Sequence, residues 1–113
     1  STATEAFYSV ILHEFVHWSG HPTRLNRDLS GRFGTNAYAI EELVAELGAA
    51  FLCAELGISV HPRQDHAAYV RSWLIVLRQQ KTAIFTAASS STAACRFLEE
   101  LATAKTNEAA CVT

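Results

Sequence analysis

The apolar residues of this chain recur mostly every three or four positions, which is the spacing of a helix that is buried on one face. A first helix is predicted over about residues 4–18, ended by Gly20 and Pro22, with four side chains available for packing, namely Phe7, Val10, Ile11 and Phe15. A second helix is predicted over about residues 37–56, with Gly57 as its C-terminal glycine. No segment shows convincing strand alternation and no repeat is present, so the chain is expected to be mainly α.

The C-terminal half is predicted to form further helices. A third helix is expected over about residues 66–81, with Asp65 as its N-cap. A short helical turn at residues 84–85 should be followed by a break at the serines 89–91. A last helix should then begin, with inward side chains at Phe97, Leu98 and Leu101. The expected architecture is a compact bundle of about four to five helices.

The length of 113 residues and an apolar content of 50% suit one domain with a core of its own. We place this domain at residues 1–103 and interpret the small and polar residues 104–113 as a flexible tail. The net charge of −2 gives no general attraction for nucleic acid phosphates. A cluster of arginines between the first two helices has two interpretations, a local basic patch and a solvent-exposed loop, and the loop is preferred. Its members are Arg24, Arg27 and Arg32.

The cysteines Cys53, Cys95 and Cys111 are odd in number and form no C-x-x-C pair, so neither a disulfide framework nor a cysteine zinc site is indicated. A reducing, cytoplasmic compartment is therefore expected. Neither a signal peptide nor a membrane-spanning stretch is recognisable in the sequence. The complete lack of methionine indicates a piece of a longer protein.

The first predicted helix contains an H-E-x-x-H motif, His13-Glu14-Phe15-Val16-His17. Because each residue of a helix advances by about 100°, His13 and His17 lie one turn apart and can bind one metal ion. Glu14 lies beside them, where a carboxylate can accept a proton from a metal-activated water and pass it to a leaving amine. The motif predicts a zinc peptidase, and the alternative is an amphipathic helix with two partly exposed histidines.

A catalytic zinc site needs a third protein ligand. The longer pattern H-E-x-x-H-x-x-G-x-x-H finds its glycine at Gly20, but Thr23 occupies its last histidine position. His21 follows His17 by one turn. Because Gly20 and Pro22 indicate that the helix has already ended, His21 ranks second as the third ligand.

Glu42 of the second predicted helix is the preferred third ligand. Its face of the helix carries Glu46 and otherwise small residues, namely Ala45, Ala49 and Cys53. Glu41 and Glu55 are expected to point elsewhere. An acid four residues after a ligating glutamate can hold one of the ligating imidazoles and fix its tautomer. The predicted zinc centre therefore consists of Glu14 as general base, Glu46 behind one imidazole, and three metal ligands, His13, His17 and Glu42.

Further groups are expected around this centre. Residues 19–36 lack periodic apolar positions and should form a long loop that crosses near the site. Stabilising an oxyanion requires an additional donor, and Tyr38, His66 and Tyr69 are available. His66 is named first as a catalytic residue, because a polar group that begins an apolar stripe needs a partner. Ordinary packing is the alternative for each of them.

Four separated blocks of the sequence are familiar, and the resemblance that they carry extends over about residues 7–101. The blocks are HEFVHWSGHPTRLN from His13, RFGTNAYAIEELVAELGAAFL from Arg32, HAAYVRSWLIVL from His66 and IFTAAS from Ile84. In this order they resemble the C-terminal zincin-like metallopeptidase domain of ArdC-type antirestriction proteins. Related domains occur in conjugation primases of the TraC type.

The resemblance implies a zincin-like helical domain with one zinc ion between its first two helices, held by two histidines and a downstream glutamate. It also implies a longer protein that protects plasmid DNA from host restriction, with single-stranded DNA bound by an N-terminal domain outside this chain. A peptide or protein would be the substrate, and no membrane partner is expected. The alternative function is a non-catalytic, metal-stabilised module that acts with the DNA-binding domain to block restriction.

Overall fold

Four helices make up the part of the chain that the computed structural model describes, which is residues 3–32, 35–58 and 66–112. They are α1 (Ala3–Ser19), α2 (Asn36–Leu56), α3 (His66–Gln79) and α4 (Ala83–Val112). These residues contain no strand, so the prediction of a mainly α bundle of four to five helices is confirmed. The described residues also include no helix that is both long and apolar enough to span a membrane.

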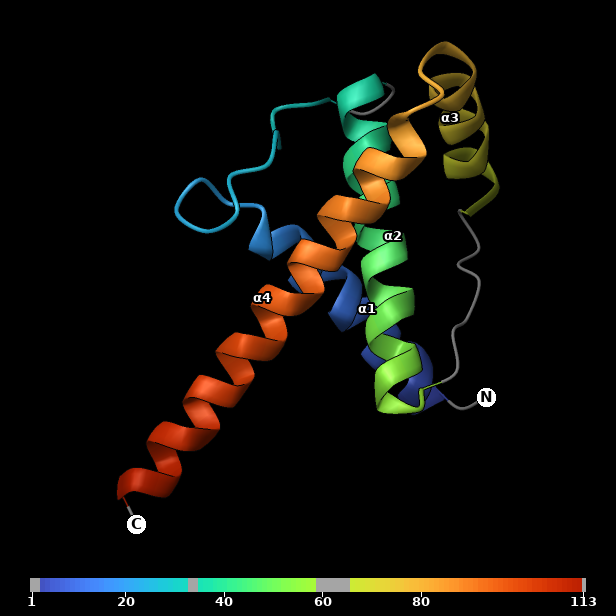
Figure 1. The fold of residues 1–113 in the computed structure, drawn as a ribbon. Coiled ribbons are helices and arrows are strands. Elements are labelled where there is room, and N and C mark those ends of the chain that lie inside the picture. The colour runs from blue at the N-terminus through green and yellow to red at the C-terminus, as the bar shows by residue number, and fades with distance from the viewer. Residues whose placement is uncertain (1–2, 33–34, 59–65, 113) are drawn as a thin grey trace.

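α2 is the central helix, because α1, α3 and α4 all pack against it (Figure 1). Thr35 caps its first turn, with the side-chain oxygen accepting a hydrogen bond from the Tyr38 backbone N at 3.3 Å. At the other end Gly57 has a φ of 70°, which glycine adopts without steric cost. The predicted C-terminal glycine is thus confirmed, while the predicted Asp65 cap of α3 lies outside the described residues.

α4 is one continuous helix of 30 residues that extends beyond the rest of the bundle (Figure 1). The predicted break at the serines 89–91 is therefore wrong. The buried Ser91 hydroxyl lies 2.7 Å from the Ala87 carbonyl oxygen and 3.0 Å from the Val44 carbonyl oxygen. Serine continues the helix because its hydroxyl is satisfied within α4 and against α2. Residues 104–112 are helical as well, and the flexibility of this tail stays a prediction.

The core lies between α2 and the helices around it, and most of its members are small or medium-sized. They include Val16, Val44, Trp73, Ala87 and Cys95. The aromatic side chains of α1 contribute less than expected, since Phe7 is 59% and Phe15 is 50% exposed. α1 instead reaches the core through Val16, which is fully buried.

α1 and α2 approach each other closely at Gly48, which faces Val16. A Cβ atom added at Gly48 would lie 2.8 Å from Val16 Cγ2 and 3.1 Å from Val16 Cγ1. Because Val16 is fully buried, it has little room to move away from a larger neighbour. This close approach brings the histidine-bearing side of α1 onto the carboxylate-bearing side of α2.

We expect Gly48→Ala to destabilise the domain by roughly 1–3 kcal/mol, because the added methyl group overpacks the contact with Val16. In an open helical position the same change would stabilise by up to about 1 kcal/mol, so the sign of the effect identifies the clash. Thermal unfolding measures the effect of Gly48→Ala on stability both in the native chain and in a chain that carries Val16→Ala. Gly48→Ala should cost far less stability together with Val16→Ala, which makes room, whereas equal losses in both backgrounds would contradict the contact.

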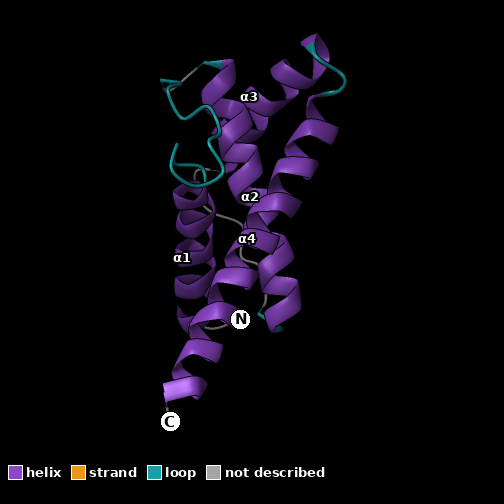
Figure 2. Cartoon of the chain, turned by 60° about the vertical axis from the view of Figure 1, so that its left-hand side comes forward, coloured by secondary structure: helices purple, strands orange, loops and turns teal. Residues whose placement is uncertain are grey.

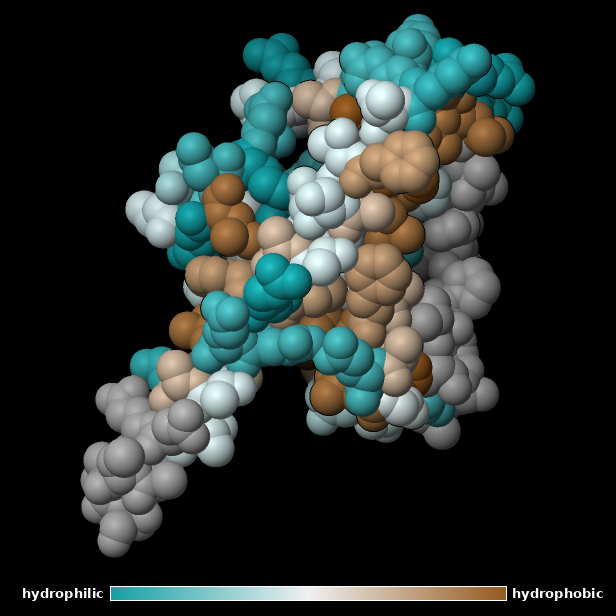
Figure 3. All heavy atoms as spheres, viewed as in Figure 1, coloured by the Kyte–Doolittle hydropathy of each residue, from teal (hydrophilic) through white to brown (hydrophobic). Residues whose placement is uncertain are grey.

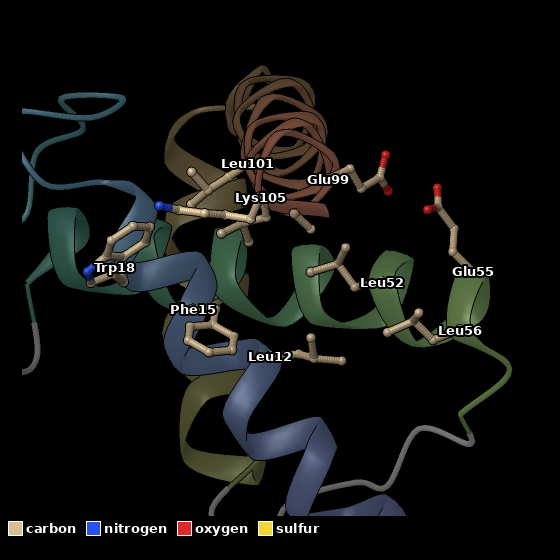
Figure 4. A pocket seen from close by; sticks show the side chains of 11 residues that line it. Leu12, Phe15, Trp18, Leu52, Glu55, Leu56, Glu99, Leu101 and Lys105 are labelled. Carbon is tan, nitrogen blue, oxygen red and sulfur yellow. The ribbon is translucent and has the colours of Figure 1, made fainter. Parts of the chain in front are cut away.

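An apolar groove of about 470 Å³ lies between α1, α2 and α4. Its lining includes Phe15, Trp18, Leu52, Leu56 and Leu101 (Figure 4). At one end the carboxylates of Glu55 and Glu99 point toward each other, and the hydrogen bond with Glu55 raises the pKa of Glu99. Further apolar side chains gather on the outer surface over α2 and α4 (Figure 3). No histidine lines the groove, so the predicted metal chemistry belongs to a different part of the molecule.

Candidate metal centre

Three side chains from α1 and α2 converge where these helices pack together. His13 and His17 project from consecutive turns of α1, and their Nε2 atoms are 3.1 Å apart. Glu42 reaches them from α2, with Oε2 3.2 Å from His13 Nε2 and Oε1 3.0 Å from His17 Nε2. The structure thus brings together the three residues that the sequence named as metal ligands, with one ligand atom of each within 4.8 Å of the others.

The spacing of these atoms suits one small divalent cation. Ligand atoms about 2.0–2.1 Å from a tetrahedral ion are roughly 3.3 Å apart, which is close to the distances within this trio. Two imidazoles and one carboxylate are also a common donor set for a zinc ion with an open position. Geometry and chemistry therefore both fit a metal ion held by His13, His17 and Glu42.

Each imidazole has a carboxylate behind it. His13 Nδ1 lies 3.0 Å from Glu46 Oε1, and His17 Nδ1 lies 2.8 Å from Glu41 Oε2. Such pairs keep the proton on Nδ1 and direct the Nε2 lone pair toward a metal ion. The prediction that Glu41 points elsewhere is wrong. Glu41 and Glu46 are about 140° apart around α2 and lie on either side of Glu42, so each reaches a different ring.

The hydrogen bonds in this cluster shift the pKa values of its members. Burial alone would lower the pKa of His17, but its bonds to Glu41 and Glu42 outweigh burial and raise this pKa to about 9. In the same way, Glu42 and Glu46 raise the pKa of His13 against the effect of burial. Burial would raise the pKa of Glu42, but its bonds to the two imidazoles lower it to about 2. Protons therefore occupy the metal-free site at neutral pH, and a metal ion has to displace them.

A pocket of about 290 Å³ opens beside the three converging side chains, and we name it the polar pocket after the charged residues among those that line it. Its lining residues come from α1, α2 and the loop that joins them, and they include Glu14, His17, Leu29, Gly31 and Tyr38. Figure 2 shows this loop beyond the C-terminal end of α1. Gly31 lets the loop lie against α2, because a Cβ atom there would be 2.5 Å from the Tyr38 backbone N. The prediction that this loop crosses near the site is confirmed, and Glu14 is exposed at the pocket wall.

The remaining residues named from the sequence lie in different settings. Tyr38 lines the polar pocket, whereas the side chains of His66 and Tyr69 lie outside the described residues. His21 is exposed, and its Nδ1 lies 2.8 Å from Thr23 Oγ1 rather than near the converging trio.

The loop between α1 and α2 is more than a solvent-exposed connection, which corrects the interpretation of its arginines. Arg24 stacks on the Trp18 ring at 3.8 Å from the centroid and donates from Nε to the Trp18 carbonyl oxygen at 2.7 Å. Arg27 turns inward, where its side chain is 11% exposed and forms an ion pair with Glu41. Arg32 is exposed. These contacts leave no periodic signal in the sequence, because they depend on the path of the loop.

Comparison with known sequences identifies relatives of this fold and site. A family model described as a zincin-like metallopeptidase matches residues 2–90. The uncharacterized protein y4eC of Sinorhizobium fredii is 57% identical over 86 residues, which cover 76% of this chain and 28% of y4eC. A DNA primase of Escherichia coli, TraC, is 47% identical over 89 residues, which cover 79% of this chain and 8% of TraC.

Solved structures of the antirestriction protein ArdC from plasmid R388 are similar as well. The Mn(II)-bound form matches with a TM-score of 0.75 and 43% identity, over 86% of this chain and 36% of ArdC. The metal-free form matches with a TM-score of 0.72 and 42% identity, over 82% of this chain and 33% of ArdC. The chain therefore spans about a third of ArdC and smaller shares of y4eC and TraC. It belongs to the zincin-like metallopeptidase family, and its likeness to ArdC confirms the resemblance drawn from the sequence.

Proposed function

We propose that this domain is a zinc-dependent peptidase, with one ion bound by His13, His17 and Glu42 and with Glu14 as general base. The observation that carries the proposal is the convergence of three ligand atoms beside a polar pocket that Glu14 lines. The Mn(II)-bound form of ArdC supports a divalent metal in this family. Zinc is preferred because two histidines and one glutamate, with an open fourth position, are typical of zinc peptidases.

The metal ligands and the residues behind them would have separate roles in peptide hydrolysis. A bound divalent cation supplies Lewis acid chemistry, which polarises a substrate carbonyl and makes water a better nucleophile. His13 and His17 bind through Nε2, while the carboxylates behind their Nδ1 atoms keep the rings from rotating. Glu42 adds one negative charge, which leaves the centre cationic and therefore attractive to a carbonyl oxygen.

Glu14 accepts the proton of the attacking water and passes it to the leaving amine. Its exposed position at the pocket wall allows the carboxylate to reach both partners. Tyr38 lines the same pocket and is the candidate donor to the oxyanion, and His66 remains a predicted second donor. The proposed substrate is a peptide or protein segment that enters this pocket.

We propose that the domain works within a longer polypeptide. ArdC is an antirestriction protein and TraC is a DNA primase, and this chain spans only a minor share of each. By analogy, the whole protein would protect plasmid DNA from restriction, with single-stranded DNA bound outside these 113 residues. The net charge of −2 is consistent with DNA binding by another part of the protein, because these 113 residues offer no general attraction for phosphates.

We expect elemental analysis to find one divalent ion per chain, and thermal unfolding to show that zinc raises the melting temperature. His17→Ala removes one of three proposed ligands and should abolish both results. His21→Ala is the matched control, because it removes an exposed histidine of the same segment and should leave both unchanged. Zinc binding retained by His17→Ala, or absent from the native chain, would remove the basis of the proposal.

A further inference from the structure

Arg27 takes no part in the proposed chemistry, yet its side chain is largely buried at the edge of the candidate metal centre. It comes from the loop after α1, and its side chain and that of Glu41 are both 11% exposed. Its guanidinium holds both oxygens of Glu41, with Nε 2.9 Å from Oε1 and Nη2 3.1 Å from Oε2. Nη1 also donates to Ser19 Oγ at 3.0 Å, and Nη2 donates to the Val16 carbonyl oxygen. This two-point contact fixes the plane of the Glu41 carboxylate.

The carboxylate that Arg27 holds is the one that orients His17. Glu41 Oε2 accepts hydrogen bonds from both Arg27 Nη2 and His17 Nδ1. Because an ionised carboxylate only accepts, the proton of the neutral ring stays on Nδ1 and the lone pair stays on Nε2. A connected path therefore runs from the loop through Glu41 to the Nε2 atom proposed to bind the metal.

The position of the guanidinium depends on a second residue, Gly20. A Cβ atom added at Gly20 would lie 2.7 Å from Arg27 Nη2 and 2.9 Å from Arg27 Cζ. The backbone at Gly20 thus leaves a space that the guanidinium fills. A side chain at Gly20 would force the guanidinium to shift relative to Glu41 without removing a polar group.

We propose that Arg27 is a positioning residue for the metal centre, which acts through Glu41 on His17 and thereby couples the loop after α1 to metal affinity. The inference rests on the proposed metal site. It also assigns a role to Gly20, which provides the space that this positioning requires. A change in the position of the loop that lines the polar pocket would then change the metal affinity of the centre, and metal binding would in turn change the position of the loop.

The affinity of each variant for Co²⁺ and Zn²⁺ tests this inference by chelator competition, on protein that circular dichroism shows to be folded. Arg27→Met should weaken binding roughly 10-fold to 100-fold, the range for groups that orient a metal ligand, and should alter the visible absorption of bound Co²⁺. Arg27→Lys keeps the charge without the two-point contact and should give an intermediate loss. Gly20→Ala should weaken binding as well, although Arg27 and Glu41 are both present.

Arg24→Met is the matched control, because Arg24 belongs to the same loop and contacts the end of α1 without reaching Glu41. Its metal affinity should stay within about twofold of the native value, since no ligand-orienting contact is lost. A double-mutant cycle separates positioning from a general loss of structure. In a Glu41→Ala background, Arg27→Met should cause no further loss of metal affinity, because the path to His17 is already broken.

Failure of the proposed function and failure of the role of Arg27 would give different results. A native chain that does not bind Co²⁺ or Zn²⁺ overturns the proposed function, and this inference falls with it. A native chain that binds them while folded Arg27→Met and Gly20→Ala bind equally well overturns the role of Arg27 alone. A loss that is undiminished in the Glu41→Ala background also overturns it, because Arg27 would then act by another route.

Discussion

Replacing Glu14 by glutamine should reduce peptide hydrolysis by the metal-loaded domain roughly 100-fold to 10,000-fold, which is the contribution of a general base. Glutamine keeps the size of the side chain but cannot take up the proton of water. Glu14 is exposed and lies outside the converging trio, so the metal content should stay unchanged. The measurement is turnover of a fluorogenic peptide library by both proteins, with the zinc content determined on the same samples.

Glu5→Gln is a suitable control for this experiment, because it changes another carboxylate of α1 near the start of the helix. Its turnover should equal that of the native domain. Equal turnover by Glu14→Gln would exclude Glu14 as the base. If the metal-loaded native domain cleaves nothing, and Glu14→Gln in the longer protein still protects plasmid DNA, the non-catalytic alternative is favoured.

The features that could be predicted from the sequence depend on local periodicity. The i, i+4 spacing of His13 and His17 defines one face of a helix whatever surrounds it. Glu42 and Glu46 stand out in the sequence because their face of the helix otherwise carries small residues, and the structure places both carboxylates against the imidazoles. Gly57 likewise marked the end of α2 through its own conformational freedom.

The features that could not be predicted depend on tertiary geometry. Glu41 reaches His17 because α1 lies over the face of α2 between Glu41 and Glu46, and the positions of residues around α2 alone do not show where α1 lies. Arg27 turns inward because the loop folds back over the end of α1. Ser91 continues α4, against its usual preference for helix caps, because a carbonyl oxygen of α2 lies within hydrogen-bonding distance.

Glu42→Gln is expected to weaken zinc binding on the order of 1,000-fold, because it replaces the anionic ligand of the trio by a neutral amide. Glu46→Gln provides the comparison, since Glu46 Oε1 lies 3.0 Å from Nδ1 of His13, on the opposite side of the ring from the Nε2 atom proposed to bind the metal. It should weaken binding by only about 10-fold to 100-fold, as expected for a residue that orients a ligand. Chelator competition with zinc measures both variants on one scale.

The assignment of Glu42 as a metal ligand can also be checked in the metal-free protein. The pKa of His17 is raised to about 9 by its bonds to Glu41 and Glu42, against the effect of burial. Glu42→Gln removes one of these carboxylates, so NMR titration should find a lower pKa for His17, whereas Glu46→Gln should leave it nearly unchanged. If Glu46→Gln weakened zinc binding as much as Glu42→Gln, or lowered the pKa of His17 as far, the assignment of Glu42 rather than Glu46 as the metal ligand would be contradicted. The two measurements together separate a carboxylate that shares the metal with both rings from one that only supports a ring from behind.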